Sequence, residues 1–207
     1  MSKVVWKGGA LLGPLPPVLV TVGDEKVNNV LTVAWTGMIS TIPPRTYISV
    51  RKNRHSYNIL NEKREFVINL TTADMVFGTD YCGIFTGAKV NKFEKCNYHL
   101  APSSSLLCPL IEESPLSLEC KVIDVIPSGS HDMFIADIVA TDINEELIDK
   151  AGKLHLDRAN LLAFSHGEYF ALGKKLGAFG FSSKKKKKKK KHYPKKEAED
   201  GKNGRNS

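Results

Sequence analysis

Short runs of apolar, β-branched and aromatic residues, bounded by Gly, Pro, Asn and Asp, recur along this chain. Such runs predict strands, and the turn residues between them predict where the strands end. The predicted strands cover residues 16–22, 30–39, 47–51, 65–70, 115–126, 131–144, 161–164 and 168–172. Many strands with few helices indicate a mainly β protein, an antiparallel β-barrel that carries peripheral helices.

Turn chemistry and local polarity predict the remaining elements. Pro43-Pro44 ends the second strand, because proline lacks the N–H that a strand ladder needs. Residues 127–130 and 165–167 are rich in Ser and Gly and predict two tight turns. Short helices are predicted over residues 56–63, over 72–81 with Thr72 or Asp74 as the cap, and over 145–150, whereas 83–95 and 101–113 are predicted loops.

The positive charge of the chain lies almost entirely at its C-terminal end. The formal charge of the 207 residues is +8, yet residues 184–207 hold 12 basic and three acidic residues, which leaves 18 basic and 19 acidic residues for 1–183. We therefore expect one domain over residues 1–183 and a disordered lysine-rich tail over 184–207. The tail could attach to nucleic acid, anionic lipid or an acidic protein, or be a solvated extension without a partner.

The cysteines and the apolar segments indicate the setting in which the protein works. No two of the four cysteines form a Cys-x-x-Cys pair, and no histidine stands at metal-ligand spacing, so no metal site is predicted. The apolar segment 11–22 is interrupted by three prolines and lacks a signal-peptide cleavage pattern. No apolar run approaches the roughly 18 residues of a membrane span. We expect a cytoplasmic protein with reduced thiols and no membrane attachment.

Small polar side chains alternate with apolar strand formers between residues 28 and 69. Alternate side chains of a strand face opposite ways, so this pattern can place a polar binding face opposite a packed one. The motifs are Asn28-Asn29-Val30-Leu31-Thr32-Val33-Ala34-Trp35-Thr36-Gly37, Ile48-Ser49-Val50-Arg51, His55-Ser56 and Glu65-Phe66-Val67-Ile68-Asn69.

A cationic cluster falls where one strand ends and a helix is predicted to begin. It consists of Arg51, Lys52, Arg54, His55 and Ser56. Free backbone N–H groups and the helix dipole favour an anion at such a place, in addition to the cationic side chains. The alternative is a solvated strand end with an ordinary helix cap.

Two later motifs complete the set, namely Thr86-Gly87-Ala88-Lys89-Val90-Asn91-Lys92-Phe93 and His131-Asp132-x-Phe134-x-Ala136-Asp137-x-Val139. In this order the motifs resemble the flavin reductase-like, FMN-binding split-barrel family, and within it the flavoredoxins. The resemblance covers about residues 8–183. Asn91 replaces the usual Asp of the family, and Ala136 replaces the usual Gly.

The resemblance implies a Greek-key split barrel that forms a homodimer around its FMN sites. It also implies transfer of a hydride from NAD(P)H to FMN, with electrons passing on to free flavin, a metal ion, oxygen or a protein. The chain has no Gly-x-Gly-x-x-Gly motif, so a nicotinamide would have to stack directly on the flavin. The alternatives are an FMN electron carrier without its own NAD(P)H site and a non-catalytic FMN-binding domain.

The resemblance also implies which residues contact the cofactor. Arg51 and Ser56 would bind the phosphate or the ribityl chain, Asn29 a ring carbonyl, and Trp35 would form a wall, although a buried tryptophan is more often simple core. His131 is the candidate catalytic residue, which would orient the flavin or the nicotinamide. The implied set is Asn29, Thr32, Ala34, Trp35, Ser49, Val50, Arg51, Ser56, Asn69, Leu70, Thr86, Gly87, Lys89, Lys92, His131 and Phe164.

Of the implied set, Phe164 would lie against the ring from the neighbouring subunit. Residues 101–113 are our further candidate for the dimer interface. Cys82 has no evident base or partner thiol in the sequence, so packing is its expected role.

Overall fold

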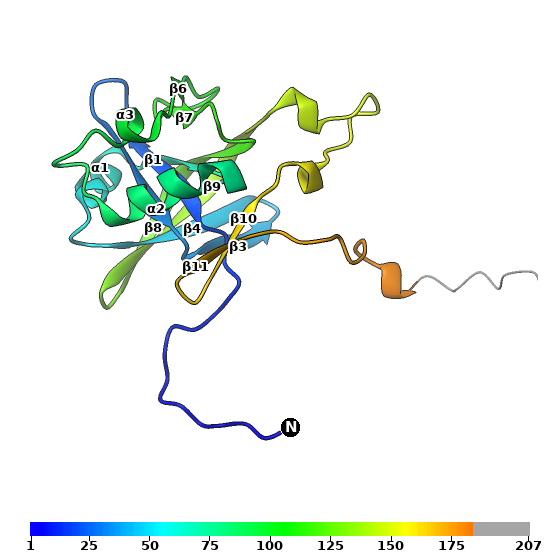
Figure 1. Ribbon diagram of the computed structural model, residues 1–207. Helices are drawn as coiled ribbons and strands as arrows, with labels where there is room; N and C mark the ends of the chain where they lie inside the picture. Colours follow the sequence, from blue (N-terminus) through cyan, green and yellow to red (C-terminus); the bar gives the residue numbers. More distant parts are fainter. Residues whose placement is uncertain (184–207) are drawn as a thin grey trace, which may run out of the picture. The chain divides into compact units, whose positions relative to one another are not determined.

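The computed structural model describes residues 1–183 (Figure 1), and the predicted lysine-rich tail over 184–207 lies outside these described residues. Met1–Gly173 forms one compact unit, and the described residues 174–183 belong to a second unit. The fold below is that of the first unit. The predicted domain boundary at residue 183 stays a prediction.

Seven strands form one antiparallel sheet in the order β2-β1-β5-β8-β9-β4-β3. Their bounds are β1 (Val18–Gly23), β2 (Asn28–Val33), β3 (Thr36–Thr41), β4 (Pro44–Arg51), β5 (Glu65–Asn69), β8 (Leu116–Ser128) and β9 (His131–Ile143). β2 and β3 stand at opposite ends of this order although only Ala34 and Trp35 separate them in the chain. The sheet therefore curls until its ends meet, where Ser49 N–H donates to the Trp35 carbonyl at 2.9 Å. The prediction of a mainly β fold is confirmed.

Helices and two small strand pairs surround this sheet (Figure 1). Their bounds are α1 (His55–Lys63), α2 (Val76–Ile84), α3 (Lys92–Cys96), η1 (Ala73–Met75), η2 (Glu145–Leu147), η3 (Leu156–Arg158), β6 (Leu100–Ala101) with β7 (Leu110–Ile111), and β10 (Leu162–Ser165) with β11 (Glu168–Ala171). The short helix η4 (Phe181–Ser183) belongs to the second unit. Across the described residues, no helix has the length and apolar character needed to cross a membrane.

Several predicted boundaries were wrong. The single strand over 30–39 is in fact two strands, because the sheet closes at Ala34-Trp35. The predicted loop over 83–95 contains the start of α3, and the Asn91 side chain caps this helix by accepting from Glu94 N–H. The turn predicted over 127–130 is only the two residues between Ser128 and His131, since β8 and β9 continue to these positions.

Two apolar clusters fix the elements that carry the site. The first fills the interior of the curved sheet and contains Val20, Phe66 and Phe134, together with Leu60 from α1. The second lies under α2 and α3 and contains Leu19 and Val30. β1 is buried along its whole length because clusters cover both of its faces, which explains its nearly unbroken apolar sequence. α1, α2 and α3 are thus held against β1 and β2.

Candidate flavin-binding site

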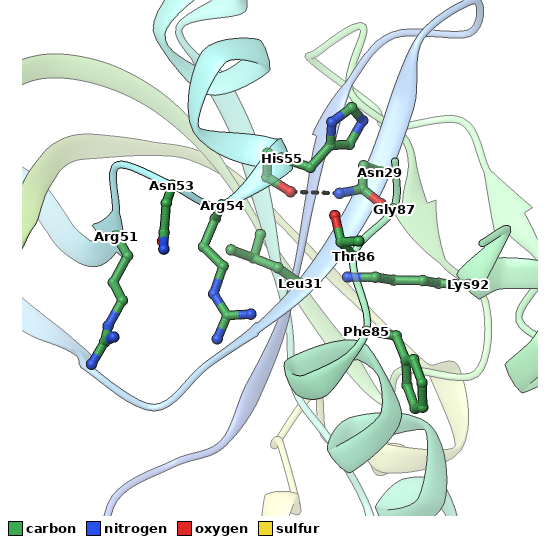
Figure 2. A pocket seen from close by; sticks show the side chains of 11 residues that line it. Asn29, Leu31, Arg51, Asn53, Arg54, His55, Phe85, Thr86, Gly87 and Lys92 are labelled. Carbon is green, nitrogen blue, oxygen red and sulfur yellow. Dashed lines mark hydrogen bonds between the residues drawn. The ribbon is translucent and has the colours of Figure 1, made fainter. Parts of the chain in front are cut away.

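A cavity of about 300 Å³ opens between β2, the start of α1 and the loop that joins α2 to α3 (Figure 2). Segments far apart in the sequence meet here because α1 and α2 both pack on β2. We call this cavity the phosphate end. Its lining residues are Asn29, Leu31, Arg51, Asn53, Arg54, His55, Ser56, Phe85, Thr86, Gly87 and Lys92.

Two arginines flank the start of α1. Arg51 is the last residue of β4, and Arg54 is the N-cap of α1. The Arg54 side chain makes no capping hydrogen bond, and Figure 2 shows the side chains of Arg51 and Arg54 extending beside each other. The first N–H groups of an α-helix lack partners within the helix and carry positive partial charge. Backbone and side chains together thus make this end of the cavity attractive to an anion.

A buried hydrogen bond shapes the opposite wall. Asn29 Nδ2 donates to Ser56 Oγ at 2.7 Å, and both side chains are buried. Gly87 lies against this pair, because a Cβ atom at residue 87 would stand 2.1 Å from Asn29 Oδ1. Only glycine leaves room here for the loop to approach β2 so closely.

Lys92 supplies a buried cation to the same cavity. Its side chain is 4 % exposed, and Nζ donates to the carbonyls of Val30 at 2.7 Å and Cys82 at 2.9 Å. Burial, with a smaller contribution from the charge of Arg54, lowers the pKa of Lys92 to about 8. An ammonium group has three donors, so one N–H remains for a ligand in the cavity.

A second cavity of about 380 Å³ continues from the first and shares Leu31, Arg51 and Arg54 with it. We call it the ring end, and we call the two cavities together the groove. Its other lining residues are Thr32, Val33, Ala34, Trp35, Ser49, Val50 and His131.

An aromatic pair borders the ring end. The Trp35 ring is 41 % exposed and lies 4.5 Å from the His131 ring, centroid to centroid. Trp35 is therefore a surface of this groove and not part of the core. Burial lowers the pKa of His131, and the charges of Arg51 and Arg54 lower it further. His131 is accordingly held in its neutral form near pH 7.

A family model described as "Flavin reductase like domain" matches residues 13–173. The chain belongs to the flavin reductase-like family. Among solved structures, the flavoredoxin of Desulfovibrio vulgaris (Miyazaki F) is 26 % identical, with a TM-score of 0.81, over 88 % of this chain and 100 % of that chain.

Two further proteins are similar to this chain, one in fold and one in sequence. The fold is similar to that of an FMN-binding protein from Thermus thermophilus, which is 22 % identical, with a TM-score of 0.72, over 86 % of this chain and 99 % of that one. By sequence, an NADPH-flavin oxidoreductase of Streptomyces viridifaciens is 23 % identical over 146 residues, which are 69 % of this chain and 74 % of the relative.

The donor set of the two cavities fits a phosphorylated flavin. A flavin mononucleotide has a dianionic phosphate at one end and a flat tricyclic ring at the other. The phosphate end offers three cationic side chains, Arg51, Arg54 and Lys92, and the ring end offers an aromatic wall and strand backbone. No group of three or more metal-ligating side chains lies within the described part of the chain.

The structure gathers most of the predicted contacts of this flavin reductase-like chain around one groove. Lys89 lies at a neighbouring opening, beside Asn29, Gly87 and Lys92. The predicted contacts at the phosphate end are Asn29, Arg51, Ser56, Thr86, Gly87 and Lys92, and those at the ring end are Thr32, Ala34, Trp35, Ser49, Val50, Arg51 and His131.

Three predicted contacts are not brought to the groove. Asn69 is fully buried, and its side chain hydrogen-bonds within the protein. It donates to the Leu19 carbonyl at 3.1 Å and accepts from Ile111 N–H at 2.9 Å. Its neighbour Ile68 points into the sheet interior, so Asn69 faces the opposite side. The N–H of Leu70 pairs with Leu116. Phe164 packs on Tyr169 in the β10–β11 pair, so its contact with a flavin stays a prediction for an assembled dimer.

Asn53 was missing from the predicted set, and Arg54 was predicted only as a member of the cationic cluster and not as a cofactor contact. Their signal was present, because both stand close before the predicted helix start, where an anion is favoured. Cys82, for which packing was expected, is buried under α2, with its Sγ 4.0 Å from Cys96 Sγ. Burial raises the pKa of Cys82 to about 12. A thiol with so high a pKa is a poor nucleophile, which fits the packing role.

We expect Gly87→Ala to weaken flavin binding at least about tenfold, because the new methyl group would push Asn29 away from Ser56 and narrow the phosphate end. Gly37→Ala is the matched control, since a Cβ there meets Tyr47 Cε1 at an ordinary 3.4 Å. Isothermal titration of both purified variants with FMN checks the expectation. Equal affinities for the two variants would contradict it.

Proposed function

We propose that this protein is an FMN-dependent oxidoreductase of the flavin reductase or flavoredoxin type. Electrons pass from NAD(P)H through bound FMN to an acceptor, which is a free flavin, a metal ion or a redox protein. The observation that carries the proposal is the groove in which a cationic, helix-start end continues into an end lined by Trp35 and His131. Family membership and the similarity to flavoredoxin support it.

Each end of the groove has a separate task in this proposal. Arg51, Arg54, Lys92 and the first turn of α1 hold the phosphate, so they fix the position of the flavin along the groove. Trp35 and neutral His131 border the ring and orient whatever stacks on it. Bound FMN supplies the capacity to accept a hydride, and the protein supplies position and electrostatics. Hydride transfer needs no general base, so no catalytic triad is required.

A second candidate function is an FMN electron carrier that receives its electrons from another protein. The structural similarity to flavoredoxin favours this candidate as well. The third is a non-catalytic FMN-binding domain. All three share the groove. Reduction of the bound flavin by NAD(P)H separates the reductase from the other two, and passage of electrons through the flavin separates the carrier from the binding domain. A cytoplasmic location, expected from the unpaired cysteines, belongs to the same proposal.

We expect anaerobic addition of NADH or NADPH to the FMN-loaded protein to bleach the visible flavin absorption band. The ring end is open to solvent at Trp35, so a nicotinamide can approach the flavin there. Stopped-flow absorbance with each nucleotide checks this. Bleaching by dithionite but not by either nucleotide would reject the reductase and leave the electron carrier or the binding domain.

We further propose a homodimer with two flavin sites at or near the subunit interface. Large apolar side chains of the β3–β4 hairpin are exposed, among them Met38 at 60 % and Ile42 at 92 %. A second subunit would bury them under a two-fold axis. Phe164 and residues 101–113 are the predicted interface contacts. Sedimentation velocity across a dilution series checks the dimer, and a monomer that retains FMN would contradict it.

A further inference from the structure

Aromatic side chains form a stripe along α2, in which Phe77 and Phe85 are exposed and Tyr81 is half-buried. Phe77, Tyr81 and Phe85 recur every four residues and share one face of the helix. Their rings stack in sequence, with centroids 5.8 Å and 4.3 Å apart. Phe77 is 61 % exposed, and Ile84 beside these rings is 64 % exposed. We call Phe77, Tyr81, Ile84 and Phe85 the α2 stripe. A contiguous apolar patch of this kind marks an interaction site.

The α2 stripe has an acidic border and reaches the candidate flavin site. Asp74 and Asp80 are exposed on the same stretch of chain, and Asp80 accepts a hydrogen bond from the Tyr169 hydroxyl at 3.2 Å. At the other end of the stripe, Phe85 lines the phosphate end of the groove. A chain that covers the stripe therefore lies beside the flavin phosphate.

The N-terminal segment is apolar and basic, so it complements the apolar α2 stripe and the aspartates beside it. Residues 1–12, which we call the N-terminal arm, are exposed throughout, and they include Val4 at 84 %, Val5 at 94 % and Trp6 at 75 %. The arm contains Lys3 and Lys7 but no acidic residue. Burial of large apolar side chains is stabilising, so this arm gains stability only when something covers it.

The root of the arm is fixed while the arm itself leaves the body. Leu15 pairs with Phe164 of β10 through two backbone hydrogen bonds of 2.8 Å. From this point the arm extends away from the sheet and helices (Figure 1). Pro14, Pro16 and Pro17 surround the root, and their φ angles are fixed. A second copy of the chain is a surface that an arm leaving its own body can cover.

We propose that the N-terminal arm of one subunit packs on the α2 stripe of a second copy. The inference rests on the homodimer proposed above. The stripe from Phe77 to Phe85 is about 12 Å long at 1.5 Å per helical residue. Four extended residues span about 13 Å, so Val4 to Lys7 match the stripe in length. The lysines of the arm then meet the aspartates beside the stripe, and a two-fold axis repeats the contact.

This packing makes the arm part of the site. Trp6 of the partner subunit lies over the stripe and next to Phe85, at the rim of the phosphate end. Each subunit thereby closes one side of the other subunit's flavin groove.

Cross-linking between two different chains tests the inference. One chain carries Trp6→Cys and the other Ile84→Cys, each with its own affinity tag and each with Cys96→Ser, because Cys96 is the one native thiol that is only partly buried. After subunit exchange and mild oxidation, we expect a disulfide between the two chains. It should form at least about tenfold faster than in the matched pair with Lys121→Cys, an exposed residue of β8, because docking raises the effective concentration of the two thiols.

Three results would overturn the inference. The first is a rate equal to that of the Lys121→Cys control. The second is closure only within one chain when both substitutions are placed together, which would mean that the arm folds back on its own α2. The third is a monomer in sedimentation of the same samples, which would reject the homodimer as well. A dimer without the cross-link rejects the arm contact alone and leaves the proposed dimer standing.

Tryptophan fluorescence tests the same contact in an arm of unchanged sequence, without introduced cysteines. The chain has two tryptophans, so Trp35→Phe leaves Trp6 as the only one. We expect blue-shifted, protected emission from Trp6 in the dimer and solvent-exposed emission after Phe77→Asp. Solvent-exposed emission in both proteins would contradict the docking.

Discussion

Replacing Arg51 and Arg54 together by alanine is expected to weaken FMN binding by at least about 100-fold, while riboflavin binding changes by less than about threefold. Hydrogen bonds to charged groups contribute about 1.5–3 kcal/mol each, and the double variant removes two cationic donors from the phosphate end. Riboflavin lacks the phosphate, so its affinity should depend far less on these side chains, which also border the ring end. Isothermal titration with both ligands measures the two affinities.

Arg45→Ala is the matched control for this pair. Arg45 lies on the same strand, β4, but at its other end, where it pairs with Asp137 at 2.6 Å. Its removal should leave both affinities unchanged. An equal loss of FMN and riboflavin affinity in the double variant would show that the arginines support the fold of the groove, and it would reject the phosphate assignment.

The strands of the barrel could be predicted from the sequence, but the closure of the sheet could not. Runs such as residues 65–70 are short, apolar and bounded by polar turns, so local chemistry already determines them. Ala34 and Trp35 carry no such local signal, and they look like part of one long strand. The break there arises because β2 and β3 pair with different neighbours, which is a property of the whole sheet.

The site residues could be predicted where their position follows from the alternation of side chains along a strand or from the start of a helix. Trp35, Arg51 and Ser56 lie in the groove because they end or interrupt the elements that meet there. Asn69 has a similar local sequence, yet its direction is set by the inward position of Ile68 and by partners from residues 109–117. These partners are distant in sequence. The alternation of side chains along a strand therefore could not distinguish a residue that contacts the cofactor from a buried residue that hydrogen-bonds within the protein.

The role of Lys92 likewise depends on contacts that are distant in sequence. The loop motif predicts a cation that offsets phosphate charge, and an isolated lysine-rich loop would be ordinary surface. In the structure Lys92 is buried and tied to Val30 on β2 and Cys82 on α2. The consequence is a lowered pKa, which makes the cation titratable near neutral pH and gives it a measurable signature.

We expect FMN affinity to fall about tenfold as the pH rises from 7 to 9.5, because Lys92, with a pKa of about 8, loses its charge in this interval when no anion is bound. The phosphate stays dianionic over this range and Arg51 and Arg54 stay protonated, so neither explains such a loss. In Lys92→Met the affinity should be lower at pH 7 and nearly independent of pH up to 9.5. Titrations of both proteins with FMN and riboflavin check this, and a wild-type affinity independent of pH would contradict it.

The unliganded protein should respond to pH in the opposite direction. The pKa of Lys92 is below its ordinary value of 10.5 in the folded state, so the unfolded chain binds more protons between about pH 8 and 10.5. The contribution of Lys92 to the free energy of unfolding therefore rises with pH across this window, and below pH 8 its buried charge is fully destabilising. Urea unfolding of the apoprotein at pH 7.5 and 9.5 measures this contribution as the difference between wild type and Lys92→Met. A cation that strengthens FMN binding while it weakens the empty fold is expected of a group positioned for a ligand, whereas a merely structural lysine would change only the stability.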